Sequence, residues 1–300
     1  MRIKRIVVMI ALNFGIKMVA QEKMNISIDI ENGVLNSTIY PVKNAETVLL
    51  LHGGPGVPDQ MKEVAQLLNK TYQVIFFEQR GTGNSHCPDC SYTMEDYISD
   101  INAIANQYQL DSFHLFGHSW GGLYAQIYAE KYPSKMKSLF LCSPSSGTNK
   151  AWKETEKEVM AYNKKKASNG EWLAMGWNSL LGTFGNEKAY RKLFKQVYKN
   201  YHSDFQEIEI NEEELTGIFT EPINKTRKEI IKYKSLERVE NSPFPICISY
   251  GENDVYGQSK INAIERFPTA RIYEIENCGH IPWLHNPIEF RKILTEFYNL

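Results

Sequence analysis

The chain has 300 residues, of which 42% are apolar and 23% charged, and its formal net charge is −1. This composition is typical of a globular protein whose length suits one large α/β domain or a core with an insertion. A charge so close to zero provides no basic field, so we expect no nucleic-acid partner.

The N-terminus differs from the rest of the chain. Three basic residues open it, and an apolar run continues to the small residue Ala20. This pattern predicts a secretory signal peptide over residues 1–20, although the charge of Lys17 and the size of Met18 fit it poorly. The alternative is an N-terminal helix or a disordered arm. Cleavage would leave 30 basic and 35 acidic residues, a net charge of −5. It would export the protein to the periplasm or medium with no membrane span, whereas an uncleaved chain would be cytoplasmic.

The first half of the chain predicts an antiparallel hairpin followed by alternating strands and helices. Apolar residues alternate over 24–30, and a Glu31-Asn32-Gly33 turn leads into a returning strand over 34–42. Continuous apolar runs then alternate with helical stretches, which indicates a parallel sheet with helices on both faces. The expected strands are residues 47–51, 73–77, 112–116 and 137–142. The expected helices are residues 59–68 and 123–132, and a further helix that begins at Thr93. Asp96, three residues after Thr93, is its expected capping partner.

A helical insertion interrupts this alternation. Residues 149–241 are rich in Lys, Glu and aromatic side chains at helical spacing and contain no convincing buried strand. We therefore predict a core formed by residues 21–148 and 242–300, with residues 149–241 as a helical lid. The second core part should hold strands at 244–250 and 270–275 and helices at 259–267 and 287–298.

The segment Gly117-His118-Ser119-Trp120-Gly121 matches the pattern G-x-S-x-G between a predicted strand and a predicted helix. This context is the one that a nucleophile elbow requires. A strand that turns directly into a helix strains the turn residue, and small neighbours let the two segments pass closely. Ser119 is therefore the candidate nucleophile, at a helix N-terminus that favours negative charge.

A serine nucleophile needs a base and a group that orients the base. In sheets with this elbow the chain order is Ser, then Asp or Glu, then His. Asp254 and His280 follow the last two predicted strands, so both should reach the sheet edge that carries Ser119. Glu252 is the alternative acid and His285 the alternative base.

Acyl transfer also needs hydrogen-bond donors for the developing oxyanion. The backbone N–H of Trp120, directly after the serine, is one candidate. The segment His52-Gly53-Gly54-Pro55-Gly56 follows the first parallel strand, and we predict Gly54 as the second donor, with Gly53 as the alternative. These glycines also suit an ordinary strand-to-helix turn.

The five cysteines indicate no metal site. Cys87 and Cys90 form a C-x-x-C without a second pair to complete a zinc site, and a local loop disulfide is the favoured interpretation over redox or metal chemistry. Cys142 and Cys247 lie in apolar strands and should be buried thiols. Cys278 precedes His280 by two residues, where it either fills the core or lies near the site. We expect no metal and no organic cofactor.

Three motifs resemble those of the α/β-hydrolase superfamily, and within it the prolyl iminopeptidase-like serine peptidases. They are the glycine-rich 52–56 segment, Gln79-Arg80-Gly81-Thr82-Gly83-Asn84-Ser85, and the 117–122 elbow. The resemblance covers residues 45–145 well, with weaker support around Asp254 and His280. It implies an α/β-hydrolase fold, a Ser119–Asp254–His280 triad and an oxyanion hole at Gly54 and Trp120. It also implies that Arg80 is a structural charge near the site rather than a catalyst.

Two departures from the family bear on substrate recognition. Glu78 replaces an aspartate that the family usually has, and the lid lacks the family's tryptophan–glutamate motif. The lid instead offers Asn211-Glu212-Glu213-Glu214. Glu213 and Glu214 are candidates for binding a cationic substrate amine, although such a run is more often a solvated helix face.

The resemblance implies a serine aminopeptidase that releases N-terminal residues from small peptides, with proline favoured. The alternative is a carboxylesterase or lactonase acting on small-molecule esters, since family members with the same core include both. A non-catalytic binding protein on this fold is the third hypothesis, and the full Ser119–Asp254–His280 set argues against it. The oligomeric state is not indicated.

Overall fold

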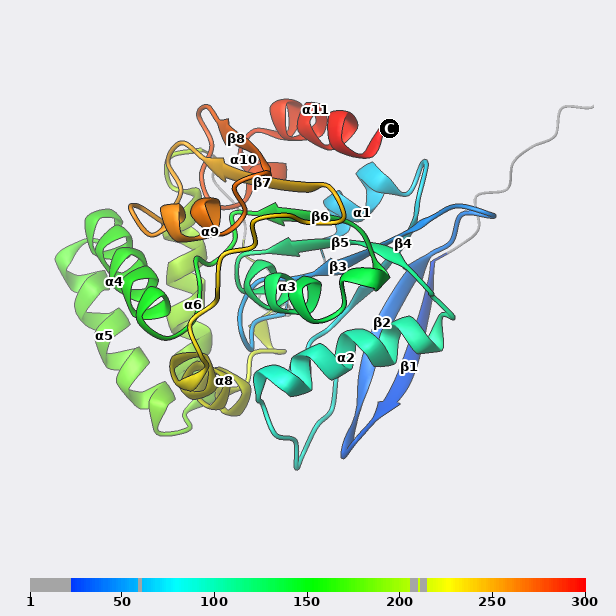
Figure 1. Cartoon of the computed structure of the whole chain (residues 1–300). Helices are drawn as coiled ribbons and strands as arrows, with labels where there is room; N and C mark the ends of the chain where they lie inside the picture. The colour runs from blue at the N-terminus through cyan, green and yellow to red at the C-terminus, as the bar shows by residue number, and fades with distance from the viewer. Residues whose placement is uncertain (1–22, 59–60, 206–209, 211–214) are drawn as a thin grey trace, which may run out of the picture.

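The computed structural model describes residues 23–58, 61–205, 210 and 215–300. The predicted signal peptide and the candidate side chains Glu213 and Glu214 lie outside these residues. An eight-stranded sheet in the order β1-β2-β4-β3-β5-β6-β7-β8 runs through the molecule (Figure 1). Its strands are β1 (Met24–Ile30), β2 (Gly33–Tyr40), β3 (Thr47–Leu51), β4 (Gln73–Phe77), β5 (Phe113–His118), β6 (Met136–Cys142), β7 (Ile246–Gly251) and β8 (Arg271–Ile275).

The sheet is antiparallel at one edge and parallel elsewhere. β1 pairs with β2, and β2 with β4, in antiparallel registers. All pairs from β4 through β3 and β5 to β8 are parallel. The predicted fold class, a mostly parallel sheet with an N-terminal antiparallel hairpin, is confirmed. The carboxyl ends of the parallel strands consequently share one side of the molecule.

Helices cover both faces of the sheet (Figure 1). Every residue of β3 is buried. Leu49 and Leu51 join the apolar cluster that includes α2 and α3, whereas Val48 and Leu50 join the cluster that includes α1 and α11. A strand packed on both faces needs a continuous apolar run, which explains the sequence pattern. The core helices are α1 (Lys62–Leu68), α2 (Met94–Gln107), α3 (Trp120–Lys131), α9 (Lys260–Arg266), α10 (Pro282–His285) and α11 (Pro287–Tyr298).

Several element boundaries differ from the sequence prediction by one to three residues; α3, for example, begins at Trp120 instead of residue 123. The elbow strand runs to His118 instead of ending at residue 116, because Gly117 and His118 continue the ladders with β3 and β6. The helix predicted over 59–68 is observed from Lys62 onward, and residues 59–60 lie outside the described part. The expected capping box of α2 is present, with Thr93 and Asp96 each bonding the other's backbone N–H.

Between β6 and β7 the described chain is helical. These helices gather on the side to which the parallel strands run (Figure 1). Trp152 is buried there and meets the Trp120 ring edge-on at 6.3 Å between centroids, which joins the segment to the elbow helix. The helices are α4 (Asn149–Lys166), α5 (Asn169–Thr183), α6 (Glu187–His202) and α8 (Thr220–Lys232).

Candidate active site

Ser119 occupies a sharp turn between β5 and α3, with φ of 53° and ψ of −119°. A positive φ is strained for a residue with a side chain, and packing must hold it. A Cβ added to Gly117 would lie 2.7 Å from the Gly121 carbonyl oxygen, and a Cβ at Gly121 would collide with the Leu51 carbonyl. Only glycines allow this close approach, so the motif's glycines maintain the strained serine.

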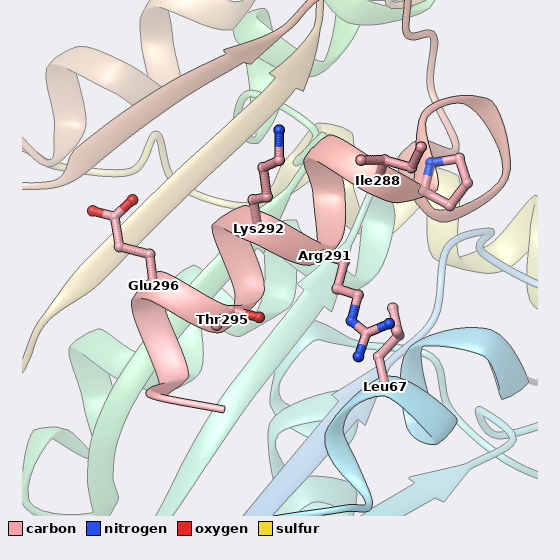
Figure 2. A pocket seen from close by; sticks show the side chains of 7 residues that line it. Leu67, Ile288, Arg291, Lys292, Thr295 and Glu296 are labelled. Carbon is pink, nitrogen blue, oxygen red and sulfur yellow. The ribbon is translucent and has the colours of Figure 1, made fainter.

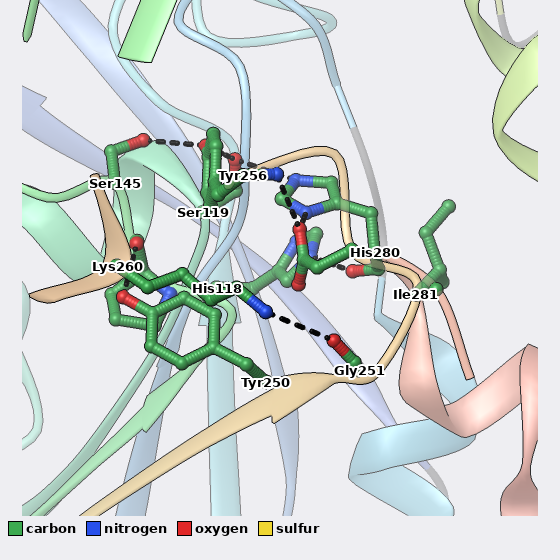
Figure 3. Close-up of polar contacts among 12 residues, drawn as sticks. His118, Ser119, Ser145, Tyr250, Gly251, Tyr256, Lys260, His280 and Ile281 are labelled. Carbon is green, nitrogen blue, oxygen red and sulfur yellow. Dashed lines mark hydrogen bonds and ion pairs between the residues drawn. The ribbon is translucent and has the colours of Figure 1, made fainter. Parts of the chain in front are cut away.

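The structure brings Ser119, His280 and Asp254 into one hydrogen-bonded chain. Figure 3 labels Ser119 and His280. His280 Nε2 lies 3.0 Å from Ser119 Oγ, and His280 Nδ1 lies 2.9 Å from Asp254 Oδ1. Because the serine hydroxyl carries a proton, it donates to Nε2, and Nδ1–H donates to the carboxylate. The three residues follow β5, β8 and β7, respectively, at the shared carboxyl edge of the sheet. This arrangement allows the imidazole to take the serine proton during attack on a carbonyl carbon.

The Asp254 side chain is fully buried, with 0% of its surface exposed. Burial raises the pKa of this carboxyl, but the charge and hydrogen bond of His280, together with further hydrogen bonds to the carboxylate, hold the pKa below its usual value. The backbone N–H of Tyr256 also donates to Asp254 Oδ1, at 3.2 Å. Asp254 is therefore an ionised acceptor that orients the imidazole.

Glu252 and His285, the alternative acid and the alternative base, form their hydrogen bonds with other groups. The Glu252 carboxylate accepts the backbone N–H of Asn277 at 3.0 Å. His285 accepts the Gly279 N–H at Nδ1, and its Nε2 lies 3.0 Å from Nδ1 of His202. Both side chains thus hold the loops around His280 rather than contacting Ser119.

A tyrosine that belongs to none of the sequence motifs also contacts the serine. The Tyr256 hydroxyl lies 3.1 Å from Ser119 Oγ and 2.7 Å from Ser145 Oγ (Figure 3). Burial raises the pKa of Tyr256 well above its ordinary value, so the phenol keeps its proton and can donate. Tyr256 follows Asp254 by two residues, and Ser145 lies after β6. Both residues follow strands that end at the carboxyl edge of the sheet, and this position is the sequence feature from which their presence near Ser119 could have been predicted.

The loop predicted to supply an oxyanion donor lies against Ser119. A Cβ added to Gly53 would be 3.3 Å from Ser119 Cβ, and Gly54 adopts a φ of 121° that favours glycine. The Trp120 N–H belongs to the first turn of α3, where no intrahelical acceptor exists. Both predicted donors therefore belong to backbone segments that adjoin Ser119.

A buried network connects that loop to the elbow. The Trp120 indole donates to Gln79 Oε1 at 3.0 Å, and Gln79 Nε2 donates to the His52 carbonyl at 2.7 Å. His52 Nε2 accepts the Gln79 N–H, so its Nδ1–H donates to the Gly53 carbonyl. Burial lowers the pKa of His52 to about 4, which keeps this ring neutral. Neither Gln79 nor the His52 ring was assigned a role from the sequence.

His118 contacts the backbone of His280. Its Nε2–H donates to the backbone carbonyl of His280 at 2.9 Å, while its Nδ1 is buried without a hydrogen-bond partner among the described residues. The pKa of His118 is lowered to about 3, mainly by burial and secondly by the nearby His280. A neutral imidazole with a single donor satisfies this geometry.

Arg80 forms a buried bidentate ion pair. Its Nε and Nη2 donate to the two carboxylate oxygens of Asp100 at 2.8 and 2.6 Å. Its Nη1 donates to the Ser91 carbonyl. The neighbouring departure from the family, Glu78, accepts the Asn84 N–H at 2.8 Å and so closes the turn that follows Arg80. Neither side chain bonds to Ser119.

The cysteines are divided between one disulfide and three buried thiols. Cys87 and Cys90 are bonded to each other, and Cys142, Cys247 and Cys278 are free and buried. Cys278 belongs to the apolar cluster beneath α11, so it fills the core. Within the described ranges, no group of three or more His, Cys, Asp or Glu side chains is placed to hold a metal ion.

A hollow of about 640 Å³ lies far from this constellation, between α1 and α11 (Figure 2). None of the residues that line it belongs to the Ser119 network, and its walls are the side chains of one surface helix and Leu67. The hollow is therefore separate from the Ser119 site. The lining residues are Leu67, Pro287, Ile288, Arg291, Lys292, Thr295 and Glu296.

Comparison with known proteins identifies the class. The sequence profile of the family described as alpha/beta hydrolase fold matches residues 46–287, so the chain belongs to this family of hydrolases. A proline iminopeptidase of Lactobacillus delbrueckii subsp. bulgaricus is 28% identical over 277 residues, which cover 83% of this chain and 88% of the relative. The predicted resemblance to proline iminopeptidases is confirmed.

Solved structures with different activities share the fold. The proline iminopeptidase of Mycobacterium smegmatis superposes with a TM-score of 0.63 at 17% identity, covering 92% of this chain and 98% of that one. A thermophilic esterase from Thermogutta terrifontis gives 0.65 at 18% identity, covering 93% and 98%. At such identities the likeness concerns the fold alone.

Proposed function

We propose that the chain is a serine hydrolase that works through an acyl-enzyme and that it releases N-terminal residues, proline above all, from small peptides. The observation that carries the hydrolase part is the unbroken hydrogen-bond chain from Ser119 through His280 to Asp254. The aminopeptidase part rests on relatives named proline iminopeptidase that align over most of the chain.

The proposed reaction has two halves. Ser119 Oγ attacks the scissile carbonyl while its proton passes to His280 Nε2, and the N–H groups of Trp120 and Gly54 stabilise the oxyanion. His280 then gives the proton to the leaving nitrogen, and the acyl group stays on Ser119. A water molecule, deprotonated by the same imidazole, attacks the ester, and the acid leaves as Ser119 regains its proton. Asp254 holds the imidazole and stabilises its protonated form throughout.

Selection of a free amine requires a carboxylate near the substrate's N-terminus. A protonated α-amino group is cationic, and a partly desolvated carboxylate would favour it over a blocked amide. Glu213 and Glu214 remain the candidates for this role. They lie outside the described residues, so this assignment comes from the sequence alone.

An esterase is the second candidate. The esterase from Thermogutta terrifontis superposes as well as the mycobacterial proline iminopeptidase does. The same Ser119 chemistry would then act on small-molecule esters, and no amine would be required for turnover.

The test compares three substrates: proline p-nitroanilide, the same anilide with a blocked amine, and p-nitrophenyl acetate. We expect cleavage of the free anilide and little of the blocked one. Equal cleavage of both anilides, or of the acetate alone, would favour the esterase. Ser119→Ala should lower every rate by about 10⁴-fold or more with an unchanged unfolding midpoint. Substantial activity in that variant would contradict the whole proposal.

We also propose export, through cleavage of residues 1–20. The Cys87–Cys90 disulfide suits an oxidising compartment, where such bonds persist. N-terminal sequencing of the protein recovered from periplasm or medium tests this, and a start at Met1 in that fraction would contradict cleavage.

A further inference from the structure

Helix α5 exposes a stripe of large apolar side chains. Leu173, Trp177, Leu180 and the C-capping residue Phe184 are 74%, 62%, 49% and 82% exposed. Their spacing of four, three and four residues places them along one face of a helix. Single exposed apolar residues are ordinary, but a continuous row of them marks an interaction surface. We call these four residues the apolar stripe.

The stripe is not the side of α5 that packs on the protein. The packed side carries Met175 and Gly182, both buried, and Tyr190 of α6 fills the space where a side chain at Gly182 would lie. α5 therefore has apolar residues on two sides, one of which is exposed to solvent. The helix itself lies at the outer margin of the molecule (Figure 1). Its single charged residue, Glu171, is paired with Lys199 of α6 at 2.8 Å.

A row of lysines accompanies the apolar stripe on the adjoining helix. Lys188, Lys192, Lys195 and Lys199 are exposed on α6 at the same spacing of four, three and four residues. The short turn after Phe184 joins the two helices into a hairpin. The ends of the two rows are linked by neighbouring residues: Lys199 pairs with Glu171, two residues before Leu173, and Lys188 follows Phe184 by four residues.

The excess of positive charge extends over the whole of this region. Residues 149–205, which form α4 to α6, contain 11 basic and 6 acidic residues, a net charge of +5, whereas the entire chain carries −1. A helix with an exposed apolar row beside a basic row is the pattern of elements that lie in the interface of a membrane. Lysines near such a surface are attracted by anionic headgroups, and tryptophan favours the headgroup level.

We propose that the apolar stripe of α5 and the lysine row of α6 dock the protein on a lipid surface that contains anionic phospholipid. Leu173, Trp177, Leu180 and Phe184 would enter the boundary between headgroups and acyl chains, and the lysines would contact the headgroups. Docking would be peripheral: none of the helices in the described residues is long and apolar enough to cross a bilayer.

Charge favours a lipid surface over a second copy of the chain. Two copies related by a two-fold axis would bring the same surface of each together, and both would carry the +5 region. Like charges would then face each other around the apolar contact, whereas an anionic bilayer offers the complementary sign.

The test measures sedimentation of the full chain with vesicles of phosphatidylcholine alone and of phosphatidylcholine with about 30% phosphatidylglycerol. We expect binding to the anionic vesicles that weakens as salt rises from about 50 to about 500 mM. Trp177→Ser combined with Phe184→Ser should weaken it at least about tenfold, since two large side chains lose their burial. Lys188→Gln with Lys192→Gln should weaken binding to anionic vesicles only.

Ile288→Ser is the matched control, because Ile288 is 70% exposed on α11, at a distance from α5. It should bind like the wild type. All variants share one N-terminus, so differences between them report on the substituted helix. Unchanged turnover of a soluble substrate and an unchanged melting temperature show that each variant is folded. Absence of wild-type binding, or equal binding by the α5 variant, would overturn the proposal. So would concentration-dependent dimerisation without lipid that Trp177→Ser abolishes, which would identify a second copy as the occupant.

Discussion

The Tyr256 hydroxyl contacts Ser119 Oγ at 3.1 Å, from the same loop that carries Asp254. Since Ser145 bonds the same phenol at 2.7 Å, hydrogen bonds can run in one direction from Ser145 through Tyr256 and Ser119 to His280. Each hydroxyl then donates to the next group. Such a chain fixes the serine rotamer that directs its proton toward the imidazole.

Tyr256→Phe should therefore lower kcat about 3- to 10-fold with little change in KM, because a hydrogen bond of about 1 kcal/mol to the nucleophile is lost. Steady-state kinetics on whichever of the three test substrates is cleaved measures this. Tyr250→Phe is the control, since Tyr250 is also buried but its hydroxyl donates to the Pro144 carbonyl at 3.0 Å. Wild-type kcat in Tyr256→Phe would show that the contact has no part in turnover.

Asp254→Asn should lower kcat about 10⁴-fold, because an amide neither holds the required imidazole tautomer nor stabilises its positive charge. Glu252→Gln provides the matched control two residues away. Its carboxylate bonds the Asn277 N–H and not His280, so activity should stay within about threefold of wild type. If Glu252→Gln were the inactive variant, the assignment of the acid would be reversed.

Buried neutral histidines should make the fold sensitive to acid. The pKa of His118 is lowered to about 3, against about 6.5 in the unfolded chain, so below pH 6.5 the unfolded state binds more protons. Stability from this group is full above pH 6.5 and is lost as pH falls toward 3. Between pH 7 and 5 the loss amounts to about 2 kcal/mol.

Urea unfolding of His118→Gln at pH 7 and pH 5 checks this expectation. A glutamine amide can donate to the His280 carbonyl as the imidazole does, but it does not titrate, so the decline should be about 2 kcal/mol smaller than in wild type. Substitution of the exposed His86 by Gln serves as the control and should keep the wild-type decline. The same decline in His118→Gln would exclude His118 as the source.

Arg80→Ala should reduce the free energy of unfolding by about 3–5 kcal/mol, because Asp100 stays buried without its partner. Arg227 also forms a bidentate ion pair, with the carboxylate of Glu156, but the Arg227 side chain is 54% exposed. Arg227→Ala should cost about 1 kcal/mol or less, since solvent screens that pair. Denaturant titrations of both variants measure the two losses in free energy of unfolding. Equal losses would show that burial does not account for the strength of the Arg80 ion pair.

The sequence alone determined the class of fold, the elbow and the residues that meet there. Hydrophobic periodicity reports which segments are strands or helices, and the carboxyl ends of parallel strands share an edge, so Ser119, Asp254 and His280 could be expected together. The need for glycine at positions 117 and 121 could also be predicted from the sequence, because a turn this tight leaves no room for a Cβ.

Only the tertiary structure decided which way the side chains point. Glu252 and Asp254 are nearly equivalent as residue types, and the fold directs one to Asn277 and the other to His280. The contacts of Tyr256 with Ser119 and Ser145 join loops that the pattern of the chain does not relate. Helical spacing likewise predicted a helix around Trp177, but only its packing on neighbouring helices determines which apolar side faces solvent. Side-chain direction depends on contacts between distant segments, which local periodicity does not encode.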